Sequence, residues 1–336
     1  MSPDADAGTG RKAPGPRLDQ HAHIPVLGIR IAFESNDAAV IGVADEAFGA
    51  WRVLDNAPRL LSDVRMRFRI LVEEGEAGTS GEHVRITYWQ PDQMRVILRA
   101  GGTVGVADAA RRESVLYTSR AAIADRQHFR YGILEALTLA VLTRLDRAPL
   151  HAACIARGET ALLLAGGSGS GKSTLAYAAA RAGYKVLSED YVNVQLEPRL
   201  RVWGMPGFLH LPPESAALFP ELENTVPALL ANGKLKLAVP LSQLGAVPAL
   251  PVAQRAGICV LERTDGAASL ETLEARLLQE ALLHRLDPGF DIFAEKISEA
   301  VRMLAGQGGW KLRVGKDPQQ ALDQIESVFG VLSGIG

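Results

Sequence analysis

A glycine-rich segment at residues 166–173, GGSGSGKS, sets the local structure near the middle of this chain. It satisfies the pattern G-x-x-x-x-G-K-[ST] of phosphate-binding loops. An apolar run, ALLLA, precedes the segment, and an alanine-rich stretch at residues 172–182 follows it. A flexible Gly/Ser linker would not be flanked by buried elements. The sequence therefore predicts a loop between a buried strand and a helix. Gly183 ends this helix, and another strand, YKVLS, follows it.

Each position of the predicted loop has a physical task in binding a nucleotide. The glycines permit backbone conformations that point successive N–H groups at phosphate oxygens, and the helix N-terminus adds the positive end of its dipole. Lys172 is expected to meet the β- and γ-phosphates, and the Ser173 hydroxyl to ligate Mg²⁺. We therefore predict ATP and Mg²⁺ as cofactors. The predicted cofactor-binding residues are Gly166, Gly167, Ser168, Gly169, Ser170, Gly171, Lys172, Ser173 and Thr174.

Two adjacent carboxylates, Glu189 and Asp190, directly follow the strand YKVLS. Phosphoryl transfer with Mg²⁺ requires one carboxylate to hold the metal and another to orient or deprotonate the attacking group. In a parallel sheet, the strand before the pair would bring both acids beside the loop. We expect Ser173 and Asp190 at the metal and Lys172, Glu189 and Asp190 in catalysis. Which acid is the base stays open at this point.

A family resemblance adds a histidine to this set. The stretch LHAACIARGETALLLAGGSGSGKSTLAYAAARAGYKVLSEDYVNV resembles the catalytic domain of the HPr kinase/phosphorylase family and its shorter relatives. In that family a histidine, a phosphate loop and an acidic pair recur in this order, and His151 is the matching histidine. The resemblance implies that His151 is catalytic and lies near the transferred phosphoryl group. Without it, a lone histidine in an apolar context is more typical of a structural residue.

The resemblance has limits that bear on the substrate. Glu189 stands where the family has an aspartate, and the extra methylene shifts the carboxylate by about an ångström, which matters when reacting atoms must be aligned. A weaker likeness continues through NGKLKLAVP, where Lys234 is a candidate substrate contact. The relatives that this chain resembles include kinases that phosphorylate a lasso-peptide precursor on serine. A homo-oligomer is a further expectation from the family.

The sequence predicts an α/β fold with a P-loop-containing HPr kinase-like catalytic domain after a small β-rich (α+β) N-terminal domain. Alternating runs such as VLGIRIAF and RMRFRILVEE indicate strands in the first third, whereas SLETLEARLLQEALLHRL is typical of a helix. The expected parts are a disordered tail at 1–22, a β-rich domain at 23–125, a linking helix at 126–148 and the catalytic domain at 149–332.

Bulk properties exclude several classes of function. The net charge is −2, which gives no reason to expect nucleic acid or an acidic membrane as the main partner. The longest apolar runs are too short and too interrupted to span a bilayer, and the polar N-terminus lacks the core of a secretory signal. Cys154 and Cys259, the two cysteines, both lie in apolar stretches. We expect a cytoplasmic protein with reduced core thiols.

Three functions fit these observations. The first is an ATP-dependent kinase that phosphorylates a serine hydroxyl of a peptide or small protein. The second is a kinase of an amino acid or another metabolite, because the loop specifies only the phosphoryl donor. The third is a nucleotide-binding regulatory module with little catalysis, which the Glu189 departure keeps open. The reverse reaction, phosphorolysis of a phosphoserine, is not indicated by any residue.

Overall fold

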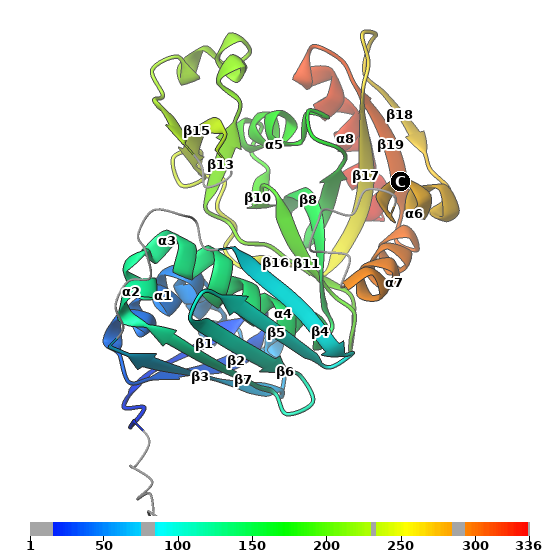
Figure 1. Ribbon diagram of the computed structural model, residues 1–336. Helices are drawn as coiled ribbons and strands as arrows, with labels where there is room; N and C mark the ends of the chain where they lie inside the picture. The colour runs from blue at the N-terminus through cyan, green and yellow to red at the C-terminus, as the bar shows by residue number, and fades with distance from the viewer. Residues whose placement is uncertain (1–15, 75–84, 230–232, 284–292, 335–336) are drawn as a thin grey trace, which may run out of the picture. The chain divides into compact units, whose positions relative to one another are not determined.

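The computed structural model describes residues 16–74, 85–229, 233–283 and 293–334 (Figure 1). The chain divides into two units, Met1–Thr138 and Leu139–Gly336. Both units combine sheet and helix, and the mixed α/β class predicted from the sequence is confirmed. Most of the predicted tail lies outside the described residues. Its last three positions belong to the first strand, which begins at Gln20.

The first unit is built on a seven-stranded sheet with the order β1-β2-β3-β7-β6-β5-β4. The pairs β2–β3 and β3–β7 are parallel, and the other neighbours are antiparallel. Its strands are β1 (Gln20–Val26), β2 (Ile29–Ser35), β3 (Arg65–Glu73), β4 (Ile86–Asp92), β5 (Arg95–Ala100), β6 (Thr103–Asp108) and β7 (Glu113–Ser119). The run VLGIRIAF is a hairpin rather than one strand, because Leu27 and Gly28 have positive φ and form the turn between β1 and β2.

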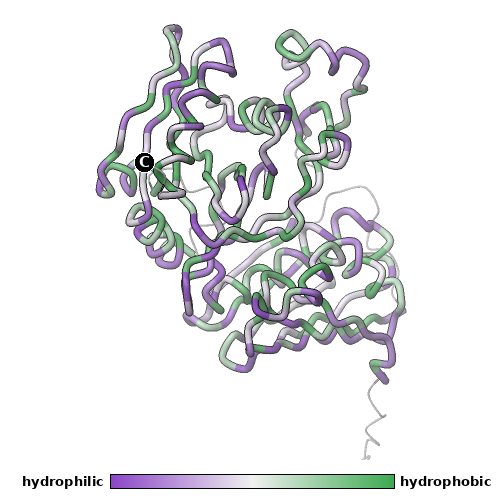
Figure 2. Tube along the Cα trace, turned by 180° about the vertical axis from the view of Figure 1, so that it is seen from behind, coloured by the Kyte–Doolittle hydropathy of each residue, from purple (hydrophilic) through white to green (hydrophobic). Residues whose placement is uncertain are grey.

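One face of this sheet is buried under helices. Along β3, Met66, Phe68 and Ile70 are buried, whereas the arginines between them point to the other face. This alternation of hydrophobic and hydrophilic residues is visible along the strands in Figure 2. Phe33, Phe48 and Phe68 pack together between the sheet and α1. The helical elements of this unit are α1 (Ala38–Phe48), η1 (Gly49–Asn56), η2 (Pro58–Leu60), α2 (Arg120–Ala124), α3 (Arg126–His128) and the π-helix η3 (Phe129–Glu135).

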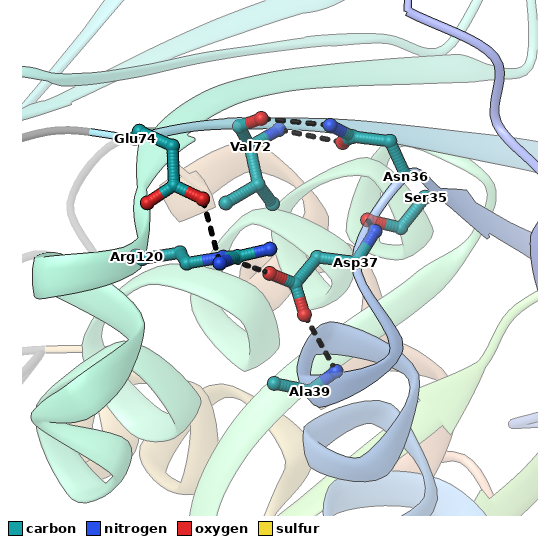
Figure 3. A network of polar contacts seen from close by, with 7 residues as sticks. All are labelled: Ser35, Asn36, Asp37, Ala39, Val72, Glu74 and Arg120. Carbon is teal, nitrogen blue, oxygen red and sulfur yellow. Dashed lines mark hydrogen bonds and ion pairs between the residues drawn. The ribbon is translucent and has the colours of Figure 1, made fainter.

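The N-terminus of α1 is held by a polar network (Figure 3). Asp37 caps the helix by accepting a hydrogen bond from Ala39 N at 2.9 Å. Its other oxygen lies 2.9 Å from Arg120 Nε, and Arg120 also pairs with Glu74 at 2.6 Å. Asn36 exchanges two hydrogen bonds with the backbone of Val72. These contacts fix the loop before α1 to the end of β3.

The segment expected as a linking helix at 126–148 is helical as far as Arg144. Its last part, α4 (Ala136–Arg144), crosses the division between the units, and β8 begins at Arg147. Buried positions recur at helical spacing, as the sequence predicts, in Phe129, Ile133 and Leu137. A π-helical stretch over Phe129–Glu135 is the feature that the periodicity did not indicate.

The second unit contains a nine-stranded sheet with the order β16-β12-β11-β8-β9-β17-β19-β18, and β10 also pairs with β8. The neighbours β9, β17 and β19 are parallel. The strands are β8 (Arg147–Arg157), β9 (Thr160–Ala165), β10 (Lys185–Ser188), β11 (Tyr191–Gln195), β12 (Arg201–Trp203), β16 (Val252–Ala253), β17 (Arg255–Arg263), β18 (Ser269–Thr272) and β19 (Gly309–Val314). Every residue of β9 is buried, which explains why its sequence is a continuous apolar run.

A small sheet, four α-helices and two 3-10 helices complete the described part of this unit. The small sheet has the order β13-β15-β14. The remaining elements are β13 (Phe208–Leu211), η4 (Pro213–Ala217), η5 (Pro220–Leu222), β14 (Pro227–Leu229), β15 (Leu235–Pro240), α5 (Lys172–Arg181), α6 (Ala275–Leu283), α7 (Ala294–Ala305) and α8 (Pro318–Leu332). The first four residues of the predicted helix SLETLEARLLQEALLHRL form the edge strand β18 instead, and its last residues lie outside the described ranges. The thiols of Cys154 and Cys259 are free and fully buried in β8 and β17, and burial raises the pKa of each.

Candidate functional site

The glycine-rich loop connects the buried end of β9 to the first residue of α5. Gly169 and Gly171 have φ of 80° and 98°, in the left-handed region that favours glycine. Gly171 is the N-cap residue of α5. A Cβ atom on Gly166 would lie 2.7 Å from Ser170 Oγ and 3.1 Å from the carbonyl oxygen of Leu261. The loop therefore folds tightly against the neighbouring strand β17, and larger residues would force it open.

Lys172 and Arg263 place two cationic side chains against this loop. The Lys172 ammonium donates hydrogen bonds to the carbonyl oxygens of Gly166 at 2.6 Å and Gly167 at 3.3 Å. Arg263 Nε donates to the carbonyl oxygen of Gly169 at 3.3 Å. In the parallel pairing of β17 with β9, Val260 lies opposite Ala165. Arg263 is therefore beside the loop because β17 continues past the end of β9.

The acidic pair lies beside the loop because β8 pairs with both β9 and β10. The sequence pattern did not predict that β8 lies between these two strands. Both β9 and β10 pair antiparallel with β8, so they run in the same direction on either side of it. Ala165 lies opposite Ala152, and Ser188 lies opposite Cys154. The carboxyl ends of β9 and β10 consequently meet near the same part of β8. Ser173 Oγ donates a hydrogen bond to Glu189 Oε1 at 3.1 Å.

His151 lies on β8 at this meeting point and contacts the second acid. His151 Nε2 is 2.7 Å from Asp190 Oδ1, and its ring lies 5.1 Å from that of Tyr191, its register partner on β11. Burial acts to raise the pKa of Asp190, but the hydrogen bond from His151 and the positive charges of His151, Lys172 and His210 lower it overall. Asp190 is thus held as a carboxylate at neutral pH.

A second histidine, His210 on β13, contacts the first acid. His210 Nδ1 lies 2.6 Å from Glu189 Oε2, and this hydrogen bond raises the pKa of His210 despite its partial burial. Glu189 is mostly buried, with 13% of its side chain exposed. Sequence reasoning missed His210 and Arg263. The signals available were a histidine inside the short run FLHL and an arginine ending a buried strand, and both are weak.

The other predicted residues lie in and around these groups. Ser168 is exposed at the tip of the loop, and Thr174 is half-buried in the first turn of α5. Lys234 is exposed just before β15. Within the same segment, the charge of Lys236 acts on His210 and tends to lower its pKa. Lys236 is therefore close enough to His210 to act on its charge.

The residues present fit a nucleotide and a magnesium ion. Ser173, Glu189 and Asp190 offer one hydroxyl and two carboxylates, which are the hard oxygen ligands that Mg²⁺ takes in small number beside phosphates. The described ranges contain no cluster of three or more His, Cys, Asp or Glu suited to a metal. Ser170 Oγ is buried and finds no hydrogen-bond partner among the described residues. The Ser170 hydroxyl therefore has hydrogen-bonding capacity that the described residues do not use.

Comparisons with known proteins give little beyond this geometry. No family model and no curated protein matches the chain. Among solved structures, it is similar to the Hpr(Ser) kinase/phosphatase from Coxiella burnetii, with a TM-score of 0.32 and 12% sequence identity over 56% of this chain and 99% of that one. In the described part of the chain, no helix is both long and apolar enough to cross a membrane.

Proposed function

We propose that this protein is an ATP-dependent phosphotransferase that moves the γ-phosphoryl group to a serine hydroxyl of a peptide or small protein. The observation that supports this most directly is the hydrogen bond between Ser173, the last residue of the loop pattern, and Glu189. It joins the phosphate-binding half of the site to the acidic pair. A lasso-peptide precursor is one acceptor of the proposed class.

The loop and its cations would bind the donor. Backbone N–H groups of the loop and the N-terminus of α5 suit phosphate oxygens, and Lys172 supplies a positive charge beside them. Ser173 and Asp190 would hold Mg²⁺, which neutralises charge on the phosphates when bound. Asp190 suits this role because its lowered pKa keeps it ionised.

The acidic pair and the histidines would serve the transfer step. The serine oxygen forms a bond to the γ-phosphorus as the bond to the β-phosphate oxygen breaks, and the hydroxyl proton passes to a carboxylate. Glu189 is our candidate for that carboxylate, because Asp190 is assigned to the metal. His151 holds Asp190 in position through its 2.7 Å contact and adds positive charge near the phosphoryl group.

The test uses γ-labelled ATP, the full chain and a panel of serine-containing peptides that includes those encoded by neighbouring genes. Lys172→Ala should abolish label transfer and leave the fold intact by circular dichroism. Lys185→Ala is the matched control, because Lys185 also donates to a backbone carbonyl, that of Gly245, but is exposed at the start of β10. Transfer that survives in Lys172→Ala would rule out the proposed function.

Two other results would assign the site differently. Label that appears on a metabolite and on no peptide would point to a small-molecule kinase. ATP binding without transfer to any acceptor, unchanged in Glu189→Asp, would point to a regulatory module. Comparison of Glu189→Gln with Asp190→Asn separates the base from the metal ligand, since loss of the metal ligand should raise the Mg²⁺ requirement and loss of the base should not.

A further inference from the structure

The strand β4 forms one end of the first unit's sheet (Figure 1), and its residues are either exposed or half-buried. Among the described residues it pairs with one strand, β5. The strand at the other end of the sheet, β1, has mostly buried residues in its second half. The outer edge of β4 therefore presents main-chain N–H and C=O groups that no other described strand pairs with.

The features of β4 that hinder pairing with a further strand lie at one end of it. Pro91 removes a main-chain donor, the register with β5 shifts between Trp89 and Asp92, and Asp92 pairs with Arg95 at 2.5 Å. Residues 86–90, ITYWQ, contain no charged residue, proline or glycine. Natural proteins commonly blunt an open edge with such residues. The edge formed by residues 86–90 has no such residue and is therefore suited to pairing with an extended polypeptide.

The side chains around this edge favour a particular kind of polypeptide. Trp89 is 45% exposed and lies opposite Ile97 on β5. Ile97 lies opposite Val106 on β6, and Val106 lies opposite Val115 on β7. An apolar row thus crosses the open face of the sheet and ends at Trp89. A strand added beside β4 would direct every second side chain to this open face, and one of these side chains would lie next to Trp89.

Positive charge lies at the other end of the same edge. Arg99 is opposite Thr87 in register, and Arg85 directly precedes β4. Both arginines are exposed, and neither forms an ion pair with another described residue. Elsewhere on the open face, arginines of β3 are paired with Glu34 and Glu113. Exposed arginines that have no described ion-pair partner beside this edge favour acidic side chains on the added strand.

We propose that β4 is a docking edge for an extended acceptor peptide in which acidic and apolar residues alternate. The peptide pairs its main chain with residues 86–90, sets an apolar side chain against Trp89 and places a carboxylate near Arg85 and Arg99. Main-chain hydrogen bonds supply affinity in this binding mode, and side-chain contacts supply specificity. The identification of the peptide as the acceptor rests on the proposed kinase function; the docking edge itself does not.

The experiment measures binding by fluorescence anisotropy without nucleotide, on the full chain. The probes are labelled serine-containing peptides of about eight residues, a common strand length, with alternating Glu and Leu, and the same peptides with Lys in place of Glu. The acidic probe should bind wild type and Lys172→Ala alike. Trp89→Lys and Arg99→Glu should each weaken it about tenfold. Arg30→Glu, an exposed arginine on β2 of the same sheet, should leave it unchanged.

Three results would overturn the docking edge. The first is no binding of the acidic probe to wild type. The second is equal binding to wild type, Arg99→Glu and the folded Trp89→Lys variant, with thermal unfolding as the check on folding. The third is a concentration-dependent dimer, seen by sedimentation, that Trp89→Lys dissociates while no probe binds, which would assign the edge to a second copy. Binding at the edge with no phosphoryl transfer by wild type would instead reject the kinase function and retain the docking edge.

Discussion

His210 Nδ1 lies 2.6 Å from Glu189 Oε2, which connects β13 of the small sheet to the turn that follows β10. The two residues lie on different sheets of the second unit, and Glu189 also accepts a hydrogen bond from Ser173 of the loop. A change in the charge of His210 therefore acts on the loop through one intervening carboxylate. This chain of contacts makes the site sensitive to pH.

The pH dependence has a defined direction. The hydrogen bond that His210 donates to Glu189 raises the pKa of His210 above its ordinary value of 6.5. The stabilisation from the pair is therefore complete below pH 6.5 and is lost as the pH rises through the folded-state pKa. Glu189→Gln should move the pKa of His210 back down, as measured by the titration of its imidazole proton signals in NMR spectra.

Arg263 should contribute to nucleotide affinity. Its guanidinium lies beside the loop, within 3.6 Å of where a Cβ on Gly171 would be, so a bound phosphate would meet a second cation. Arg263→Ala should weaken ATP binding about tenfold, equivalent to about 1.4 kcal/mol, in isothermal titration calorimetry. Arg255→Ala removes an exposed arginine at the opposite end of the same strand and should have no effect. Equal affinities of the two variants would contradict this role.

The sequence predicted the elements around the loop well because their signals are local. The apolar run of β9, the glycines and the alanine-rich α5 are contiguous, and the acids follow the next strand along the chain. The pairing of β8 between β9 and β10 could not be predicted, because strand order depends on contacts between distant segments. His210 and Arg263 were missed for the same reason, since each reaches the site from a separate strand.

Local propensity also misled at two places. The run SLET precedes a helical pattern, but it is an edge strand because it pairs antiparallel with β19. The run VLGIRIAF reads as one strand, yet Gly28 permits the turn that divides it. In both cases a tertiary pairing decides the structure, and alternation of apolar residues alone does not contain that information.

Gly204 should be indispensable to the position of the acidic pair. A Cβ atom on Gly204 would lie 2.1 Å from the carbonyl oxygen of Leu187, two residues before Glu189. Gly204→Ala must push this backbone away and should lower the free energy of unfolding of the second unit by about 1–3 kcal/mol, measured by urea denaturation. Gly207→Ala is the matched control, because nothing lies within 4 Å of its Cβ position. If the two variants are equally stable, the close packing of Gly204 against Leu187 is wrong.

Asp37 should stabilise α1 mainly as a helix cap. Asp37→Ala removes both the hydrogen bond to Ala39 N and the ion pair with Arg120, and should cost about 1 kcal/mol of local stability. Asp37→Asn retains the capping oxygen and should cost less, because the Arg120 side chain is 60% exposed and such pairs contribute little. Hydrogen exchange of the first amides of α1 measures both effects, with Asp63→Ala as an exposed control. Equal acceleration in the alanine and asparagine variants would instead assign the stabilisation to the ion pair.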